Sequence, residues 1–421
     1  MARQSYLVPG LAAPLLAGLL LGGCAVPANP PRAPGPGQWI ASWGTAQLVP
    51  EGENALAPAS WHDASLRQVV RVSLGGSRLR VKISNVFGTA PLVVDGASIG
   101  LAGPGGRVSG LQPLRFGGKA EVTIPAGVEY LSDAVELAHA AGADLAVSLH
   151  FPEAPARQTG HPGARATSYL VQGQRVMDPE WPGAQTFTRW YQLAGVEVQA
   201  APGAHAVVAI GDSITDGYGV EPDTYGRWTD HLATRLRAAG AGDVGVINAG
   251  IGGGRLLRDG LGPNLVARFE RDVLARPGVS HAIVMIGVND LGVQHRNGED
   301  SPAARAQLLD EMRAALRQLV ARAHTAGVCV IGATISPYGG SGYYQPGPDN
   351  EADRQAINGW IRDAGVFDGT VDFDAVLRDP ARPERLLPAY DNDGLHPSAP
   401  GYKAMADAVP LEGLTQCHRR Q

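Results

Sequence analysis

The sequence predicts an α/β protein in two parts: an antiparallel β-sandwich of jelly-roll type at residues 39–200, then a parallel sheet with helices on both faces at residues 201–421. Two observations favour this fold class. The first part holds short alternating or apolar runs and no long helical period, which is typical of antiparallel sheets. The second part alternates short apolar runs with helical segments, which is typical of a parallel sheet. Each part is long enough to bury a core of its own.

In the first part, residues 78–83 alternate charged and apolar side chains with a period of two, as a half-buried strand does. Residues 66–72 precede them across a segment with two glycines, and the two runs are expected to pair as a hairpin. Further strands are expected at residues 121–124, 144–150, 168–171 and 192–198.

In the second part, the apolar runs predict buried parallel strands, and the longer segments between them predict the helices that cover the sheet. The expected strands are residues 206–210, 244–248, 282–287, 328–335 and 370–373. The expected helices are residues 225–239, 263–275, 302–326, 351–363 and 399–408.

The first 38 residues are expected to lie outside both parts. A basic start, an apolar segment at residues 7–21 and Gly22-Gly23-Cys24 have the layout of an export signal. The ending Leu-Gly-Gly-Cys resembles a bacterial lipobox, which implies a signal at residues 1–23 and a lipid on Cys24. A cleaved signal without lipid is the alternative.

Residues 24–38 are rich in proline, alanine and glycine and are expected to form an extended tether. The protein is therefore expected to be exported, either as a periplasmic or outer-membrane lipoprotein or in secreted form. Contact with a membrane is expected only through the lipid anchor.

Four short motifs lie in the second part. Residues 211–216 have the sequence Gly-Asp-Ser-Ile-Thr-Asp, residues 248–253 Asn-Ala-Gly-Ile-Gly-Gly, residues 287–290 Gly-Val-Asn-Asp, and residues 393–396 Asp-Gly-Leu-His. In sequence and order they resemble the GDSL, or SGNH, hydrolase superfamily, over about half of the chain. The resemblance implies a flavodoxin-like catalytic domain of SGNH type. It also implies a serine hydrolase that acts on carboxylic ester bonds without a cofactor.

Ester hydrolysis by this route needs a nucleophile, a base, a group that orients the base, and hydrogen-bond donors for the oxyanion. By resemblance, Ser213 is the nucleophile, His396 is the general base, and Asp393 orients His396. The implied oxyanion donors are the backbone N–H of Gly253, the side-chain amide of Asn289 and the backbone N–H of Ser213.

One departure from the family pattern concerns the oxyanion glycine. Many members have a hydroxyl residue before that glycine and an acid after it, where this chain has Gly252 and Gly254. Any of the three glycines could therefore be the donor, with Gly253 preferred.

Several residues near or like these motifs are expected to be structural. Asp212, Asp216 and Asp290 are expected to hold turns. Ser98 lies in a Gly-x-Ser-x-Gly pattern, but glycines and a proline follow where that motif requires a helix, so Ser98 is expected in a strand.

No metal site or cofactor is predicted. His281, His295 and His324 lack metal-ligand spacing and are expected on the surface or on helices. Cys329 lies in an apolar strand, so Cys329 and Cys417 are expected to be separate thiols, although export would permit a disulfide.

The substrate is the least determined feature. Tyr338, Tyr343 and Tyr344 follow a strand at the active-site edge and could stack on sugar rings, line an acyl or aryl pocket, or pack the loop. The net charge of −5 argues against a nucleic-acid partner. The expected partner is an ester substrate, and the preferred one is an acetylated glycan that loses its acetyl group.

Other functions stay open at this point. The alternative enzymatic functions are those of a lipase or lysophospholipase, an arylesterase, and an acyltransferase. The alternative of another class is an inactive glycan-binding surface lipoprotein. The β-rich part either binds glycan or only shapes the cleft.

Overall fold

The described part of the chain begins inside the predicted tether. The computed structural model describes residues 37–417. The predicted signal, Cys24 and most of the tether lie outside the described residues. Gln38, the last tether residue, already opens the first strand, β1 (Gln38–Gly44).

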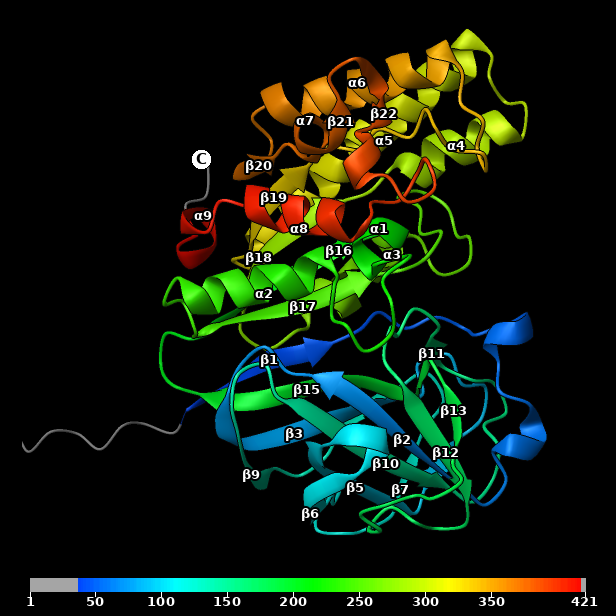
Figure 1. The fold of residues 1–421 in the computed structure, drawn as a ribbon, viewed down its shortest axis with the longest axis vertical. Coiled ribbons are helices and arrows are strands. Elements are labelled where there is room, and N and C mark those ends of the chain that lie inside the picture. The colour runs from blue at the N-terminus through cyan, green and yellow to red at the C-terminus, as the bar shows by residue number, and fades with distance from the viewer. Residues whose placement is uncertain (1–36, 418–421) are drawn as a thin grey trace, which may run out of the picture. The chain divides into compact units, whose positions relative to one another are not determined.

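The β-rich region that follows is antiparallel and contains two main sheets (Figure 1). Its longer strands are β2 (Ala64–Arg71), β3 (Gly76–Ser84), β5 (Gly96–Ala102), β6 (Val108–Pro113), β8 (Glu129–Leu131), β9 (Val135–His139), β10 (Asp144–Phe151), β12 (Ser168–Gln172), β13 (Gln185–Phe187) and β15 (Leu193–Ala200). One sheet has the order β13-β12-β2-β10-β5-β6. The other has the order β1-β15-β3-β8, with β9 also paired to β3. One hydrophobic core joins both sheets. The jelly-roll topology stays a prediction.

The predicted hairpin is wrong in its pairing. Both runs are strands, but β2 pairs with β10 and β12, whereas β3 pairs with β15, β8 and β9. The segment between them does not turn tightly because its side chains are bound elsewhere. The Ser73 hydroxyl accepts a hydrogen bond from the Val246 N–H at 2.9 Å, and Leu74 is buried in a core of the α/β region. The chain therefore passes from one sheet to the other.

The second region contains the predicted parallel sheet. Its strands are β16 (His205–Gly211), β17 (Val244–Gly250), β18 (Val279–Met285), β19 (Cys329–Ala333) and β20 (Gly369–Val371), in the order β17-β16-β18-β19-β20. Along β16, Ala206, Val208 and Ile210 enter one core, while Val207 and Ala209 enter another. Because neighbouring side chains on a strand face opposite sides, this alternation shows that both faces of the sheet are covered.

Five helices that cover the sheet, α2, α3, α5, α6 and α8, agree with the predicted ones, and two further helices, α1 and α4, carry functional motifs. The helices are α1 (Ser213–Asp216), α2 (Trp228–Ala238), α3 (Leu265–Phe269), α4 (Val288–Arg296), α5 (Pro302–Thr325), α6 (Pro348–Asp363), α7 (Phe373–Leu377), α8 (Ala399–Ala408) and α9 (Glu412–Thr415). A π-helical turn, Glu270–Leu274, continues α3. Side chains of α3, α5 and α6 lie in one core, and those of α2, α7 and α8 lie in the other. The short helices α1, α4, α7 and α9 were not predicted.

Short elements complete the structure. The strand pairs are β4 (Leu92–Val94) with β7 (Val122–Ile124), β11 (Gly160–His161) with β14 (Trp190–Tyr191), and β21 (Arg378–Asp379) with β22 (Arg382–Leu386). The 3-10 turns are Gly52–Asn54, Pro58–Ser60, Pro104–Gly106 and Pro388–Tyr390.

The β-rich and α/β regions are bonded to each other, and β1 lies beside β17 (Figure 1). The Ala41 N–H donates to the carbonyl of Pro277 at 2.9 Å. Arg276 donates from its guanidinium to the carbonyls of Thr45 and Ala194, at 2.9 and 3.0 Å. The division into two domains at residue 200 stays a prediction, and these bonds cross it.

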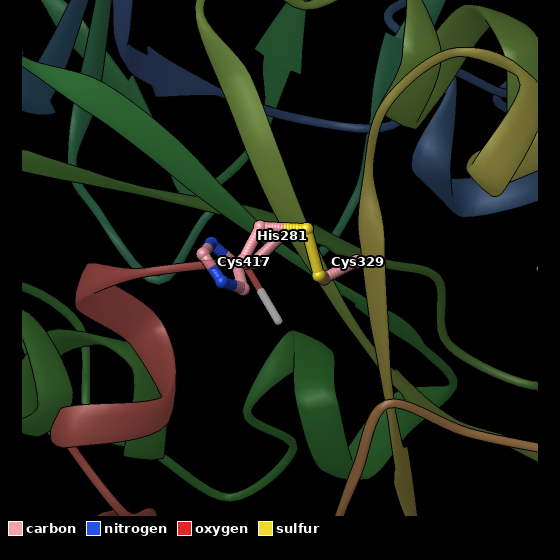
Figure 2. Close-up of side chains that lie close together, drawn as sticks. All are labelled: His281, Cys329 and Cys417. Atoms are coloured by element: carbon pink, nitrogen blue, oxygen red, sulfur yellow. A yellow bond between two sulfur atoms is a disulfide. The ribbon is translucent and has the colours of Figure 1, made fainter. Parts of the chain in front are cut away.

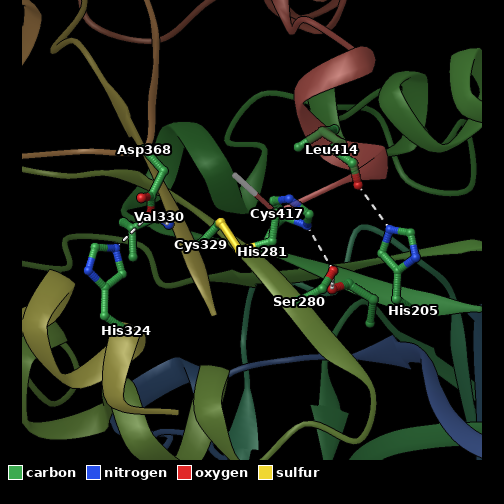
Figure 3. Close-up of a disulfide and its surroundings, with 10 residues drawn as sticks. His205, Ser280, His281, His324, Cys329, Val330, Asp368, Leu414 and Cys417 are labelled. Carbon is green, nitrogen blue, oxygen red and sulfur yellow. Dashed lines mark hydrogen bonds and ion pairs between the residues drawn. A yellow bond between two sulfur atoms is a disulfide. The ribbon is translucent and has the colours of Figure 1, made fainter. Parts of the chain in front are cut away.

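The expectation of separate thiols is wrong, because a disulfide joins Cys329 to Cys417 with a Cα–Cα distance of 5.6 Å (Figure 2). Cys329 opens β19, and the segment after α9 returns to it. His205 donates to the carbonyl of Leu414 at 2.9 Å and so holds α9 nearby (Figure 3). His281, on β18 beside the disulfide, is 1% exposed, which corrects the expectation of a surface or helical residue. His295 and His324 do lie on helices, α4 and α5.

Between residues 37 and 417, no helix is both long and apolar enough to cross a membrane.

Candidate active site

Ser213 stands where β16 passes into α1 at the carboxyl edge of the parallel sheet. Asp212 caps this helix, because its carboxylate accepts from the Ile214 N–H at 3.0 Å. Gly250, at the end of β17, permits the close approach of α1, since a Cβ there would lie 2.3 Å from the Asp216 nitrogen. The turn therefore sets Ser213 at the end of a buried strand.

Ser213, His396 and Asp393 form one line of hydrogen bonds. The Ser213 hydroxyl lies 2.8 Å from Nε2 of His396, and Nδ1 of His396 lies 2.8 Å from Oδ2 of Asp393. The other oxygen of Asp393 accepts from the backbone N–H groups of Leu395 and His396 at 3.1 and 2.8 Å. Asp393 thus holds both the turn and the imidazole. The turn requires Gly394, whose φ is +81°.

The pKa values of the histidine and the aspartate are both lowered. Burial lowers the pKa of His396 below 6.5, and the neighbouring Asp393 carboxylate only partly offsets this effect. Burial by itself would raise the pKa of Asp393, but the hydrogen bonds from the His396 backbone and side chain outweigh it. At neutral pH the pair is therefore a neutral imidazole beside a carboxylate.

Tyr218 covers one face of the imidazole, and nothing in the sequence pointed to it. Its ring stacks on His396 with centroids 4.1 Å apart and an interplanar angle of 27°. Both backbone groups of Tyr218 are hydrogen-bonded. Its N–H donates to the Ser213 carbonyl at 2.9 Å, and its carbonyl accepts from the Tyr402 hydroxyl at 2.8 Å. The guanidinium of Arg165, from the β-rich region, lies 5.7 Å from the Tyr218 ring centroid.

Asn289 lies near the start of α4, and its amide orientation is fixed from both ends. The amide nitrogen donates to the carbonyl of Gly254 at 2.8 Å, and the amide oxygen accepts from the Tyr344 hydroxyl at 2.6 Å. A carbonyl only accepts, so the nitrogen must face Gly254. One of the two amide hydrogens remains for another acceptor.

The three candidate glycines differ in what their N–H groups do. The Gly254 N–H donates to the carbonyl of Ile251 at 2.9 Å, which removes it from the candidate oxyanion donors. Gly252 and Gly253 both line the cavity beside Ser213. Gly253 has a φ of +66°, a conformation that favours glycine.

A cavity of about 470 Å³ opens beside Ser213, Asn289 and His396. Three of the most exposed apolar side chains of the α/β region stand at it: Leu261 is 73% exposed, Tyr343 63% and Tyr218 46%. Two cationic side chains, Arg255 and Arg296, line it as well. The cavity therefore combines polar groups, exposed rings and positive charge.

The three tyrosines predicted to bind substrate have different positions. Tyr343 and Tyr344 line the cavity, and their ring centroids are 4.8 Å apart. Tyr344 is buried and reaches Asn289 with its hydroxyl. Tyr338 is 1% exposed and lies in the hydrophobic core, which corrects the expectation that it contacts substrate. Its ring is needed to fill the core behind the loop.

The residues expected to be structural have structural contacts. Asp290 accepts from the N–H groups of Leu256 and Leu257 at 2.8 and 3.1 Å. Burial raises the pKa of Asp290 to about 6 and that of Asp212 to about 7. Ser98 is buried on β5, and its hydroxyl donates to the carbonyl of Val176.

One group of potential metal ligands occurs in the part of the chain that the structure describes. His281, Cys329 and Cys417 bring their ligand atoms within 4.8 Å of one another (Figure 2). Both sulfur atoms belong to the disulfide, so they are not thiolate ligands. This arrangement fits a structural link and not a metal centre.

Comparisons with known proteins find one matching family model and several solved structures that are similar to part of the chain. Residues 209–404 match the model of the GDSL-like Lipase/Acylhydrolase family. No curated protein matches the chain. Among solved structures, a GDSL-like lipase from Bacteroides thetaiotaomicron is similar, with 19% identity, 52% of this chain and 91% of that chain covered, and a TM-score of 0.38. An acetylxylan esterase from Geobacillus stearothermophilus is similar at 25% identity, with 48% and 91% covered and a TM-score of 0.36.

Proposed function

The chain carries a GDSL-like lipase/acylhydrolase domain and is an ester-hydrolysing enzyme, and on that premise we propose a serine mechanism with Ser213 as the nucleophile. The observation that carries this proposal is the line of hydrogen bonds from Ser213 through His396 to Asp393 at the wall of the cavity. A neutral imidazole within 2.8 Å of a hydroxyl is placed to take its proton.

In the acylation step, the Ser213 oxygen attacks the ester carbonyl while Nε2 of His396 takes its proton. The negative charge on the former carbonyl oxygen is stabilised by the N–H of Ser213, the N–H of Gly253 and the free amide hydrogen of Asn289. Asp393 stabilises the imidazolium that forms. When the tetrahedral intermediate collapses, the alcohol oxygen takes the proton from His396 and leaves, and the acyl group stays on Ser213.

In the deacylation step, a water molecule takes the place of the alcohol. His396 removes one proton from the water as its oxygen attacks the acyl carbonyl, and the same donors stabilise the oxyanion. Collapse releases the carboxylic acid and returns the proton to Ser213. The enzyme is regenerated without any cofactor.

The proposed substrate is a short acyl ester, in the first place acetyl, on a carbohydrate. Among the described residues that line the cavity, three are aliphatic (Leu261, Val293 and Leu395) and three are tyrosines, so rings make up as many of its apolar groups as aliphatic side chains do. The exposed ring of Tyr343 is suited to stacking on a sugar.

A lipase or arylesterase is the second candidate. The 73% exposure of Leu261 favours it, because such a side chain can contact an apolar chain or ring. An inactive glycan-binding protein would need neither the hydrogen-bonded triad nor the fixed amide of Asn289.

The test compares 4-nitrophenyl acetate with a long-chain 4-nitrophenyl ester, in the wild type and in Ser213→Ala. We expect the wild type to prefer the acetate, and Ser213→Ala to lose on the order of 10⁶ in kcat, as triad nucleophiles do elsewhere. Ser98→Ala is the matched control: it removes a buried serine hydroxyl outside the site and should retain turnover. A Ser213→Ala protein with a tenth of wild-type kcat would refute the mechanism. Preference for the long chain would favour the lipase.

A further inference from the structure

The positive charge of the active-site cavity is the feature that the serine mechanism does not use. Arg255 and Arg296 line the cavity, and Asp393, the carboxylate that also lines it, is engaged by His396. Within residues 37–417, neither arginine has a carboxylate within 4.0 Å of its guanidinium. By contrast, the neighbouring Arg258 pairs with Glu299 at 4.0 Å. The Arg255 guanidinium also acts on the carboxylates of Asp259 and Asp290, whereas Arg296 has no acidic neighbour of this kind. A cavity lined by such a cation attracts anions.

Arg296 and Asn289 both lie on helix α4, so the helix sets the distance between Arg296 and the reacting centre. Asn289, Val293 and Arg296 all line the cavity. Their spacing of four and then three residues puts them on one face of the helix. At a rise of 1.5 Å per residue, the seven steps from Asn289 to Arg296 separate them by roughly 10 Å along the axis. This distance is on the scale of a sugar residue next to the one that carries the ester.

The side chain of Arg296 is held in place without being neutralised. Its guanidinium lies 4.5 Å from the ring centroid of Tyr343 and 5.8 Å from that of Tyr344. These contacts restrain the guanidinium, one N–H of which is directed to the Tyr343 hydroxyl, and leave its other N–H donors for a carboxylate. The hydroxyl of Tyr344 also fixes the amide of Asn289. The guanidinium of Arg296 and the proposed oxyanion donor therefore contact the same tyrosine.

Arg255 lies on the loop of the candidate oxyanion glycines, two residues after Gly253. Its guanidinium donates to the carbonyl of Asp259, and its buried Nε has no partner among the described residues. Because Arg255 also stabilises its own loop, Arg296 is the residue whose replacement tests the charge without loosening the loop of the oxyanion glycines.

Building on the proposed esterase function, we propose that the substrate is an acyl ester of an anionic glycan. A carboxylate on a sugar close to the acylated one binds Arg296, with Arg255 adding to the positive field. Such a substrate satisfies the free donors of the guanidinium by charge-assisted hydrogen bonds. Tyr343 and its stacked Arg296 then form one surface for a sugar ring and its carboxylate.

The test compares acetylated oligogalacturonate with acetylated xylo-oligosaccharide as anionic and neutral substrates. We expect the wild type to prefer the anionic one, and added NaCl to reduce the preference. Arg296→Gln should lower the ratio of the two kcat/KM values about two- to fivefold, mainly through KM, as expected when an ion pair of an exposed arginine is lost. Arg296→Lys should keep part of the preference.

Arg258→Gln is the control, because it removes an exposed arginine that pairs with Glu299 outside this cavity. It should leave the ratio unchanged. A wild type without preference for the anionic substrate, or an Arg296→Gln protein with an unchanged ratio, would overturn the inference.

Failure of the esterase proposal can be told apart from failure of this inference. If the wild type hydrolyses neither substrate, calorimetry with non-acetylated oligogalacturonate still measures the anion subsite. Binding that weakens in Arg296→Gln but not in Arg258→Gln would support the subsite. Equal binding by the wild type and Arg296→Gln would refute it.

Discussion

His396 is surrounded by groups with opposite effects on its charge. Burial disfavours the imidazolium, the Asp393 carboxylate favours it, and the cation of Arg165 disfavours it. The Tyr218 ring covers one face of the imidazole. The net result is a lowered pKa, so His396 takes up a proton at a lower pH than an ordinary histidine does.

The pH dependence of the reaction follows from this environment. Because the neutral imidazole is the active form, kcat/KM should fall as the pH falls through the pKa of His396. That pKa is lowered from 6.5, so the midpoint of the acidic limb should lie below 6.5. A pH profile of kcat/KM with a neutral ester measures it. A midpoint at or above 6.5 would contradict the assignment of His396 or of its environment.

At the scale of elements, α4 is built around a contact between a glycine and a ring. Gly292 has helical backbone, but a Cβ at this position would lie 2.6 Å from the ring of Tyr344. The glycine lets Tyr344 lie against the helix and reach Asn289, three residues earlier. The contact with the Tyr344 ring therefore explains why a glycine, which weakens a helix, occupies position 292.

Gly292→Ala should therefore reduce kcat although alanine favours helices. The added methyl group must displace Tyr344, which frees the amide of Asn289, and removal of an oxyanion donor costs about 10²–10³ in kcat elsewhere. A misplaced donor should cost part of that factor, with a smaller change in KM. Steady-state kinetics on an acetate ester gives both numbers.

Gly359→Ala is the matched control for this helix substitution. Gly359 is also inside a helix, α6, but a Cβ there would meet no atom within 4 Å. It should keep wild-type kcat and be at least as stable in thermal unfolding. Equal activity of the two variants would show that Tyr344 does not position Asn289.

At the scale of the whole molecule, the β-rich region supports the helix that carries Ser213. Nε2 of His161 lies 2.9 Å from Asp216 of α1, and its Nδ1 lies 2.9 Å from the carbonyl of Ala46. Both His161 and Asp216 are buried. Arg227 connects the same parts, since it donates to the carbonyls of Asp216, Gly163 and Ala164. The β-rich region is therefore part of the scaffold of the active site.

His161→Leu should lower both stability and turnover. It removes one hydrogen bond from the buried Asp216, whose charge is still stabilised by Arg165 and Arg227, and loss of a hydrogen bond to a charged group typically costs about 1.5–3 kcal/mol. A shift of α1 moves Ser213, and a displacement of about 1 Å can reduce kcat up to about 10²-fold. Thermal unfolding and kcat measured well below the transition separate the two effects.

His150→Leu is the control for that substitution. His150 is as buried as His161 and contacts Asp95 and Asp63, but all three residues belong to the β-rich region. We expect a lower unfolding temperature and nearly unchanged kcat. If His161→Leu lowers stability alone, the β-rich region does not position the nucleophile.

The sequence by itself determined the five parallel strands and the five longer helices of the α/β region, in order, and the four motifs. Their signals are local, because an apolar run such as residues 206–210 indicates a buried strand wherever that strand lies in the sheet. The turn at residues 391–396 could also be predicted, because its aspartates and Gly394 have intrinsic turn preferences.

Only the tertiary structure decided the contacts between segments that are distant in the sequence. The pairing of β2 with β10, the bond between Cys329 and Cys417, and the stacking of Tyr218 on His396 depend on how the chain returns, which no local preference encodes. The same holds for the burial of Tyr338, one of three similar tyrosines in one loop. Non-local contacts are selected by packing of the whole core, so a residue's neighbours along the chain do not reveal them.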